Sequence, residues 1–306
     1  MVVIFHIGQA YPILNMFSYL PFLEVDIYAA QDRISSIAAE PPFLAIYLIT
    51  IAGWMFSYII TEEKATKFIP MAVILVLTYF SGSRTALLVI TLQLVLFFSI
   101  VGKSRQYKKY ILSIGASAAF LIVLLLAVNA NKVITSVTTK IESLNFQANL
   151  KKNISNKSRF GIQYASIEVF KEHPIIGAGF GQQTYEARFH YPRWATKDNY
   201  EYRDFYQNPN EKAFPPGYNL YTRLLAETGI IGTGLLLFLF YALVKQSRYL
   251  LKIARDEEYT LAIILLISFT GLIINWMQVD TFRIYGFWLC LALLIKLTGT
   301  VKKTAL

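Results

Sequence analysis

Residues that bind metals or form disulfides are scarce in this 306-residue chain. It holds one cysteine, Cys290, and three histidines, His6, His173 and His190. A single cysteine excludes a disulfide framework and a CxxC metal site, and the histidine spacing excludes an HExxH motif. The six aspartates form no Asp-x-Asp pair, and no nucleotide-binding Gly-rich loop occurs. We therefore expect no metal, no cofactor and no soluble nucleotide-binding domain.

Charged residues are also few, at 16% of the chain, whereas hydrophobic residues make up 55% and the mean hydropathy is +0.45. These values lie outside the range of ordinary soluble domains and predict a membrane protein. The net charge is nevertheless +10, from 29 Lys and Arg against 19 Asp and Glu. The positions of these cations therefore carry information.

Long hydrophobic runs predict an all-α polytopic membrane protein. A transmembrane helix needs about 20 mostly apolar residues. The weak run 2–22 lacks a basic start and a small-x-small cleavage site, so we interpret it as a helix and not as a signal peptide. With it, we expect about eight transmembrane helices, the other seven being 43–60, 68–80, 85–101, 110–128, 219–244, 260–279 and 285–298.

Lysines and arginines in the short loops predict the orientation of these helices. Thirteen of the 29 cations lie in alternate loops at 61–67, 102–109 and 245–258 and at the C-terminal end. By the positive-inside rule, these segments are cytoplasmic. The long segment 129–218 then lies on the extracytoplasmic side of the membrane. We expect three parts: N-terminal transmembrane helices (1–128), an extracytoplasmic loop domain (129–218) and C-terminal transmembrane helices (219–306).

Four arginines belong neither to the cytoplasmic loops nor to the long outer loop, and all four lie at the expected outer face: Arg33, Arg84, Arg223 and Arg283. Arginine binds phosphate through two parallel hydrogen bonds and keeps its charge. Three of them also have a purely structural interpretation. Arg33 fits a plain loop residue, Arg283 fits an ion pair with Asp280, and Arg223 fits an i, i+4 pair with Glu227. Arg84 has no acid nearby in the sequence, which favours a functional role.

The outer loop predicts an amphipathic helix over 159–174 that lies on the membrane surface, followed by a Gly-rich turn at Gly177, Gly179 and Gly181 that is weak evidence for phosphate binding. Residues 185–221 are rich in tyrosine and interleave charges of both signs. Such rings suit either a sugar-binding surface or an aromatic belt at the membrane interface. The mixed charge argues against nucleic acid as a partner.

A helix that enters the membrane from outside is predicted after Pro215, Pro216 and Gly217, with Asn219 as its N-cap. A helix N-terminus favours anions. Arginines and this helix end therefore predict an anion site at the outer membrane face.

Four segments together resemble the O-antigen ligase and polymerase superfamily. They are RISSIAAEPPFLA (33–45), SGSRTALL (81–88), SRFGIQYASIEVFKEHPIIGAGFGQ (158–182) and YNLYTRLLAETGIIG (218–232), and the resemblance covers about residues 33–290. It implies a polytopic, GT-C-like glycosyltransferase with a long periplasmic loop between two late helices. Such enzymes transfer a glycan from undecaprenyl pyrophosphate to an acceptor hydroxyl, without metal or nucleotide sugar, at the outer face of the bacterial inner membrane.

The resemblance also implies roles for particular residues. Arg84 and Arg159 are the first candidates for binding the pyrophosphate, with Arg33 and Arg223 next and Asn219 and Glu227 beside them. Ligases of the family place a histidine before the Asn of the last motif, whereas this chain has Tyr218. A neutral phenol is a poor general base at neutral pH. The proton acceptor is then open among Tyr218 and four further candidates, Glu186, Glu211, His190 and Glu227.

The departure at Tyr218 favours a polymerase of lipid-linked repeat units over a ligase that transfers the finished glycan to lipid A core or another acceptor. A transporter of lipid-linked glycan is a third alternative, but the runs 43–60 and 110–128 carry no charge. Expected partners are the undecaprenyl-pyrophosphate-linked glycan, membrane lipid, a flippase and a chain-length regulator. Eight helices are fewer than family members commonly have, so an N-terminal truncation is expected.

Overall fold

The computed structural model describes residues 41–103, 154–208, 210 and 214–304, and within these ranges the chain is helical and has no strand. The predicted helices 2–22 and 110–128, together with Arg33 and Glu211, lie outside the described residues. The chain divides into two compact units. The first comprises 1–100, 238–276 and 281–306, and the second comprises 101–237 and 277–280.

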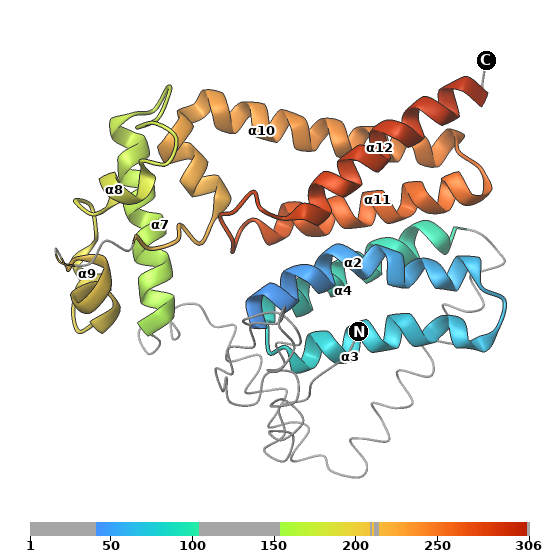
Figure 1. Ribbon diagram of the computed structural model, residues 1–306, viewed down its shortest axis with the longest axis horizontal. Coiled ribbons are helices and arrows are strands. Elements are labelled where there is room, and N and C mark those ends of the chain that lie inside the picture. Colours follow the sequence, from blue (N-terminus) through green and yellow to red (C-terminus); the bar gives the residue numbers. More distant parts are fainter. Residues whose placement is uncertain (1–40, 104–153, 209, 211–213, 305–306) are drawn as a thin grey trace, which may run out of the picture. The chain divides into compact units, whose positions relative to one another are not determined.

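Among the described residues, four helices are long and apolar enough to cross a membrane: Phe43–Thr61, Arg84–Val101, Leu220–Ile253 and Asp256–Asn275. They belong to helices α2 (Pro41–Thr61), α4 (Arg84–Val101), α10 (Leu220–Ile253) and α11 (Asp256–Asn275) in Figure 1. The predicted runs 43–60, 85–101, 219–244 and 260–279 fall on these four helices. The structure therefore supports an integral membrane protein with at least these candidate spans.

The runs predicted at 68–80 and 285–298 are also helical. They form α3 (Ile69–Phe80), which follows the 3-10 helix η1 (Ala65–Phe68), and α12 (Tyr285–Thr304). Their apolar stretches, Ala65–Tyr79 and Tyr285–Val301, are shorter than those of the four candidate spans. Twelve residues of α3 rise roughly 18 Å, against the ~30 Å of a bilayer core. Length alone therefore does not establish α3 as a complete span.

A buried glutamine connects three helices of the first unit. Gln93 on α4 is fully buried, and its Nε2 donates hydrogen bonds of 3.0 Å to the carbonyls of Ile49 on α2 and Ile267 on α11. A side chain at Gly271 would collide with this amide. Such polar contacts and small residues hold helices together in lipid, where apolar burial offers no driving force between them.

The loop predicted at 245–258 is largely wrong. Helix α10 continues to Ile253, and only Ala254 and Arg255 separate it from α11. The basic residues of this segment, Lys245, Arg248 and Lys252, therefore lie on the last turns of α10. Lysine and arginine are good helix formers, and their long side chains reach away from an apolar helix towards polar surroundings, so charge did not mark a helix end here.

The second unit is built around α7 (Ile154–Glu172), which contacts α8 (Gln183–Ala187) and α9 (Arg193–Thr196), as Figure 1 shows. The π-helix η2 (Tyr202–Tyr206) follows α9. The helix predicted at 159–174 is confirmed, but its packed face consists mainly of small residues, namely Ser158, Gly161, Ile162, Ala165, Ser166 and Val169. These small side chains let neighbouring segments approach α7 closely.

Helix α10 is broken near its start, which the sequence did not predict. Gly229 has φ 61° and ψ −160°, a conformation open essentially to glycine alone. The first part of α10 consequently meets the remainder at a sharp angle (Figure 1). Residues 230–253 still rise roughly 36 Å, which is enough to span a bilayer. Arg223 and Glu227 therefore lie on the short segment before the break.

The loop between α7 and α8 supplies the hydrogen bonds that this break removes. The amides of Ala178 and Gly179 donate to the carbonyls of Ala226 and Glu227 at 2.8 and 3.0 Å. Beyond the break, the amides of residues 230 and 231 donate to the carbonyls of residues 174 and 175 at 2.9 and 3.3 Å. A Cβ at Gly177 would collide with the Glu227 backbone, and one at Gly229 with the Ile175 carbonyl. The Gly-rich turn thus packs on α10.

Candidate anion-binding site

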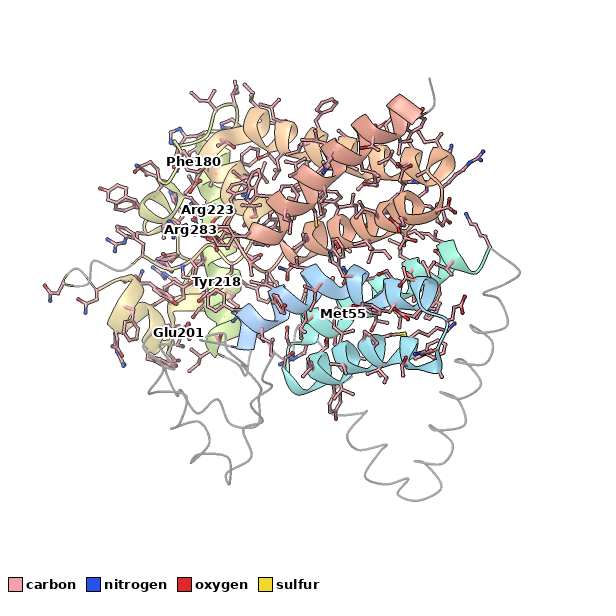
Figure 2. The ribbon with its side chains drawn as sticks, turned by 45° about the vertical axis from the view of Figure 1, so that its right-hand side comes forward. Met55, Phe180, Glu201, Tyr218, Arg223 and Arg283 are labelled. Atoms are coloured by element: carbon pink, nitrogen blue, oxygen red, sulfur yellow. The ribbon has the colours of Figure 1, made fainter. Side chains whose placement is uncertain are left out.

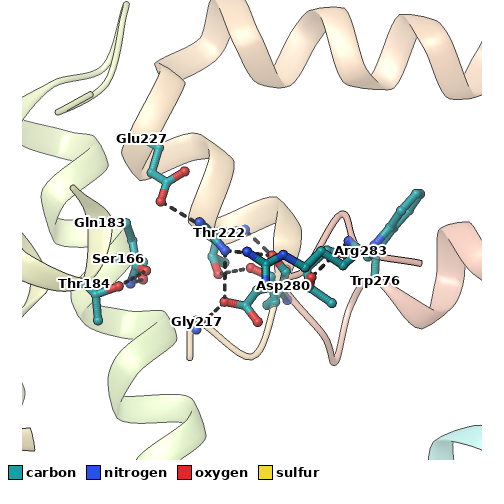
Figure 3. Close-up of polar contacts among 12 residues, drawn as sticks. Ser166, Gln183, Thr184, Gly217, Thr222, Glu227, Trp276, Asp280 and Arg283 are labelled. Atoms are coloured by element: carbon teal, nitrogen blue, oxygen red, sulfur yellow. Dashed lines mark hydrogen bonds and ion pairs between the residues drawn. The ribbon is translucent and has the colours of Figure 1, made fainter. Parts of the chain in front are cut away.

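Arg223 is held by two carboxylates of the second unit. Its Nε donates to Glu227 Oε1 at 2.9 Å, and its Nη1 donates to the carbonyl oxygen and Oδ2 of Asp280 at 3.0 and 3.5 Å. The amide of Gly217 donates to the same Asp280 oxygen at 2.6 Å (Figure 3). Glu227 is only 1% exposed, and its Oε2 has no hydrogen-bond partner. The predicted pair with Glu227 therefore exists, and Asp280 extends it.

Asn219 caps the first segment of α10, as predicted. Its Oδ1 accepts from the amides of Tyr221 and Thr222 at 2.9 and 3.3 Å. Its Nδ2 donates to Gln163 Oε1 on α7 at 3.4 Å. Both ends of the amide are thus engaged in positioning α10 against α7, which assigns Asn219 a structural contribution to the site.

Arg159 lies on α7, one helical turn before Gln163, and contacts Tyr218. The Arg159 guanidinium lies over the Tyr218 ring at 4.9 Å from its centre. Figure 2 shows Tyr218 beside α7, with Arg223 nearby at the start of α10. Arg159 Nε is buried, and no residue that the structure describes accepts a hydrogen bond from it. Tyr218 has φ 56°, which is rare for a bulky residue and often marks a functional site.

Three further tyrosines continue inward from Tyr218. Tyr206 contacts the fully buried Tyr202 at 5.5 Å between ring centres, and Tyr202 contacts Tyr191 at 4.7 Å. The pKa of Tyr206 is raised far above its usual value, mainly by burial and to a smaller extent by a hydrogen bond with Tyr218. Because these rings form the core of the unit, part of the tyrosine-rich segment is structural. Other rings of this segment are exposed: Tyr185, Phe189, Trp194, Tyr200, Phe205 and Phe214.

Helix α8 is fixed to α7 by buried polar groups. Gln183 is fully buried, and its Nε2 donates to Ser166 Oγ at 2.7 Å. The Oε1 atom of Gln183 lies close to Gly217, because a Cβ atom added to Gly217 would be 3.4 Å from it. Glu186 lies three residues further, one turn along α8, and is half-buried. The described residues give the Glu186 carboxylate no hydrogen-bond partner.

His190 lies at the opposite end of α7. Its Nε2 is 3.3 Å from Glu172 Oε2, at the last residue of the helix. Thirteen residues separate Glu172 from Arg159, which corresponds to roughly 20 Å along the helix axis. The structure therefore does not bring His190 to the Arg159 and Tyr218 pair.

Arg84 belongs to the first unit, where it begins α4 as an exposed residue. The preceding turn is formed by Gly82, with φ 65°, and by Ser83, whose Oγ accepts from the Ala86 amide at 3.2 Å. A positive charge at a helix N-terminus opposes the helix dipole. The helix dipole therefore does not favour an arginine at this position.

Sequence reasoning missed Asp280, Gln163 and Gln183 as parts of the site. Asp280 lies 57 residues from Arg223 and 63 from Gly217, so no local spacing connects them. The only signal in the sequence was that Asp280 is an acidic residue at the expected outer face, where an ion pair with Arg283 was the structural interpretation. In the structure, Asp280 instead forms an ion pair with Arg223.

Two arginines of the second unit, Arg159 and Arg223, are held in fixed positions. Arg159 offers a buried donor with no acceptor, and Arg223 is oriented by two carboxylates. Donors fixed in a poorly hydrated site stabilise a developing negative charge more strongly than the same donors in water. Arg159 is therefore the candidate donor for an oxyanion in this unit, whereas Glu227 and Asp280 already pair with Arg223.

Comparison with known proteins identifies the family. The family described as O-antigen ligase matches residues 69–239, which is more than half of the chain and includes Arg84, Arg159, Tyr218 and Arg223. No curated protein matches the sequence. Three of the four resembling segments lie within this match, whereas 33–45 lies outside it. The predicted superfamily is thereby confirmed, and the apolar helices agree with it. The chain is a membrane protein that belongs to the O-antigen ligase family of glycosyltransferase-like enzymes.

Proposed function

We propose that this protein polymerises undecaprenyl-pyrophosphate-linked repeat units at the outer face of the bacterial inner membrane. The observation that carries the proposal is the pair formed by Arg159 and Tyr218. The arginine keeps a buried donor free, and a tyrosine occupies the position that is histidine in ligases of the family. O-antigen, capsule or exopolysaccharide synthesis would use such an activity.

The proposed reaction breaks one bond and forms one. An acceptor hydroxyl oxygen on one repeat unit attacks the anomeric carbon of another glycan, whose bond to the pyrophosphate oxygen breaks. The pyrophosphate leaves with the electron pair of that bond, and the hydroxyl proton passes to a base. Arg159 and Arg223 of the second unit are proposed to stabilise the charge that grows on the pyrophosphate, without a metal ion.

Glu186 is our proposed proton acceptor. Glu227 is engaged with Arg223, and His190 is bound to Glu172 at the far end of α7. Glu186 is half-buried and lies one turn along α8 from Gln183, whose Oε1 faces Gly217. A carboxylate without a competing partner is suited to accept a proton from a sugar hydroxyl.

A ligase that transfers finished glycan to lipid A core or another acceptor is the alternative, and the family match is equally compatible with it. Tyr218 favours polymerisation because a ligase of this type would rely on the missing histidine. A flippase and a chain-length regulator are proposed as functional partners of the polymerase.

Product analysis distinguishes the two activities. The full chain, purified in detergent, is incubated with lipid-linked repeat unit alone, and the glycan products are separated by length. A polymerase yields a ladder of products that differ by one repeat. A ligase gives no ladder, and transfers glycan only when a separate acceptor is added. The latter result would reject the proposal.

A further inference from the structure

Arg188, immediately after α8, has buried donors to which the described part of the chain offers no acceptor. Its Nε and Nη2 are both buried, and neither makes a hydrogen bond to a described residue. The described residues also place no carboxylate within ion-pair distance of it. Buried guanidinium groups are normally paired, since an unpaired charged donor is costly away from water. The side chain as a whole is only half-buried, so the guanidinium lies between the interior of the unit and its surface.

Tyr191, three residues later, presents a third donor of the same kind. Its hydroxyl is buried and has no hydrogen-bond partner within the described ranges. The ring is held by Tyr202 at 4.7 Å and by the cluster that contains Ala165 and Val169, so the hydroxyl is fixed in position. Burial raises the pKa of Tyr191 to about 12, although the charge of Arg188 acts in the opposite direction. The hydroxyl therefore remains a donor at neutral pH.

Aromatic stacking fixes Arg188 on the segment that leads into α10. Its guanidinium lies 4.3 Å from the centre of the Phe214 ring, and the Arg159 guanidinium lies over Tyr218 in the same way. The two rings are four residues apart, so their Cα atoms are separated by at most about 14 Å. Pro215 and Pro216 stiffen the backbone between them. One short, stiff segment thus holds two arginines at separate positions.

We propose that Arg188 and Tyr191 form a second oxyanion-binding subsite, which accepts a carboxylate or phosphate group. Three fixed donors without an acceptor select an anion over a neutral hydroxyl, and the planar guanidinium suits two acceptor oxygens. Anion binding by this subsite does not depend on the proposed function, but the identity of the natural ligand rests on it. That ligand is either the carboxylate of an acidic sugar in the repeat unit or the lipid pyrophosphate itself.

Binding of small anions to the detergent-purified full chain tests the subsite. The probes are glucuronate and inorganic pyrophosphate, with glucose as the neutral control, measured by isothermal titration calorimetry. Pyrophosphate is measured in the Arg159→Gln background, so that Arg159 does not mask the result. Arg188→Gln should weaken binding of the preferred anion at least about tenfold, and Tyr191→Phe about threefold to tenfold. Arg193→Gln, at an exposed arginine of α9, should leave binding unchanged.

Preference for glucuronate would assign the subsite to an acidic glycan, and preference for pyrophosphate would assign it to the lipid carrier. Equal binding by the Arg188→Gln and Arg193→Gln chains, or no anion binding above that of glucose, would overturn the proposal. Because binding is measured without transfer, these results do not depend on whether the protein is a polymerase.

Thermal unfolding without anion gives a second readout. A hydroxyl that lacks a partner can be removed without loss of stability, so Tyr191→Phe should not lower Tm. A hydroxyl with a structural hydrogen bond would lower Tm on removal, and that result would also contradict the subsite. This measurement decides the question if Arg188→Gln fails to fold.

Discussion

Arg159 combines a stacked guanidinium with a buried, unpaired donor, and lysine can reproduce only its charge. We therefore predict that Arg159→Lys lowers glycan transfer at least about tenfold at an unchanged protein level, because the bidentate geometry and the contact with Tyr218 are both lost. Arg193→Lys, at an exposed arginine, is the matched control and should transfer normally. Wild-type transfer by Arg159→Lys would remove Arg159 from the site.

Asp280 orients Arg223 and accepts the Gly217 amide through the same oxygen. Asp280→Asn keeps the shape and loses the charge, so we expect a decrease of about 1–3 kcal/mol in the free energy of unfolding and slower transfer. Asp204→Asn breaks an exposed ion pair with Arg203, at 2.6 Å, and should change neither quantity measurably. Equal effects of the two substitutions in thermal unfolding would show that Asp280 has no special role.

Glu186 is assigned to proton transfer, which predicts a change in kcat and not in KM. Glu186→Gln keeps the side-chain size but removes the proton acceptor, and general-base contributions are typically about 100-fold or more in rate. Steady-state kinetics with lipid-linked repeat unit measures the two parameters separately. Glu168→Gln, on the same unit but paired with Lys171, is the control. An unchanged kcat for Glu186→Gln would show that Glu186 is not the proton acceptor.

At the scale of secondary-structure elements, the break in α10 depends on Gly229. We predict that Gly229→Ala lowers the free energy of unfolding by more than about 2 kcal/mol, since its backbone conformation disfavours a side chain and the Cβ would meet the Ile175 carbonyl. Gly234 lies five residues later on the same helix with open space around it. Gly234→Ala should therefore be neutral or stabilising by up to about 1 kcal/mol. Similar losses for both variants in thermal unfolding would contradict this account.

The elements illustrate what the sequence could reveal. Apolar runs at 43–60, 85–101 and 260–279 predicted helices correctly because length and hydropathy are local properties. The break at Gly229 was missed because it requires the loop around Ile175, more than fifty residues earlier, to supply hydrogen bonds. The site shows the same division: the pair of Arg223 and Glu227 and the Asn219 cap were predictable from spacing, whereas Asp280 was not.

At the scale of the whole molecule, we propose that the excess of positive charge separates into a topology signal and a binding function. Cations in short loops predict orientation, and the loop boundary at 245–258 was misplaced because those cations lie on helix α10. Arg159 and Arg223, by contrast, are held by specific partners in the second unit. A transporter would need charged residues near the centre of several spans, whereas Arg159 lies on α7 and Arg223 on the segment of α10 before the break at Gly229.

The most direct test counts the lipid carrier released against the repeats joined. Purified full-length protein is incubated with lipid-linked repeat unit in the presence of EDTA, and undecaprenyl pyrophosphate and glycan chain lengths are measured in the same samples. The account predicts one undecaprenyl pyrophosphate for each new glycosidic bond, in a ladder of products and at a rate that EDTA does not change. Glycan transfer without a ladder, or activity lost in EDTA and restored by a divalent ion, would contradict a metal-independent polymerase.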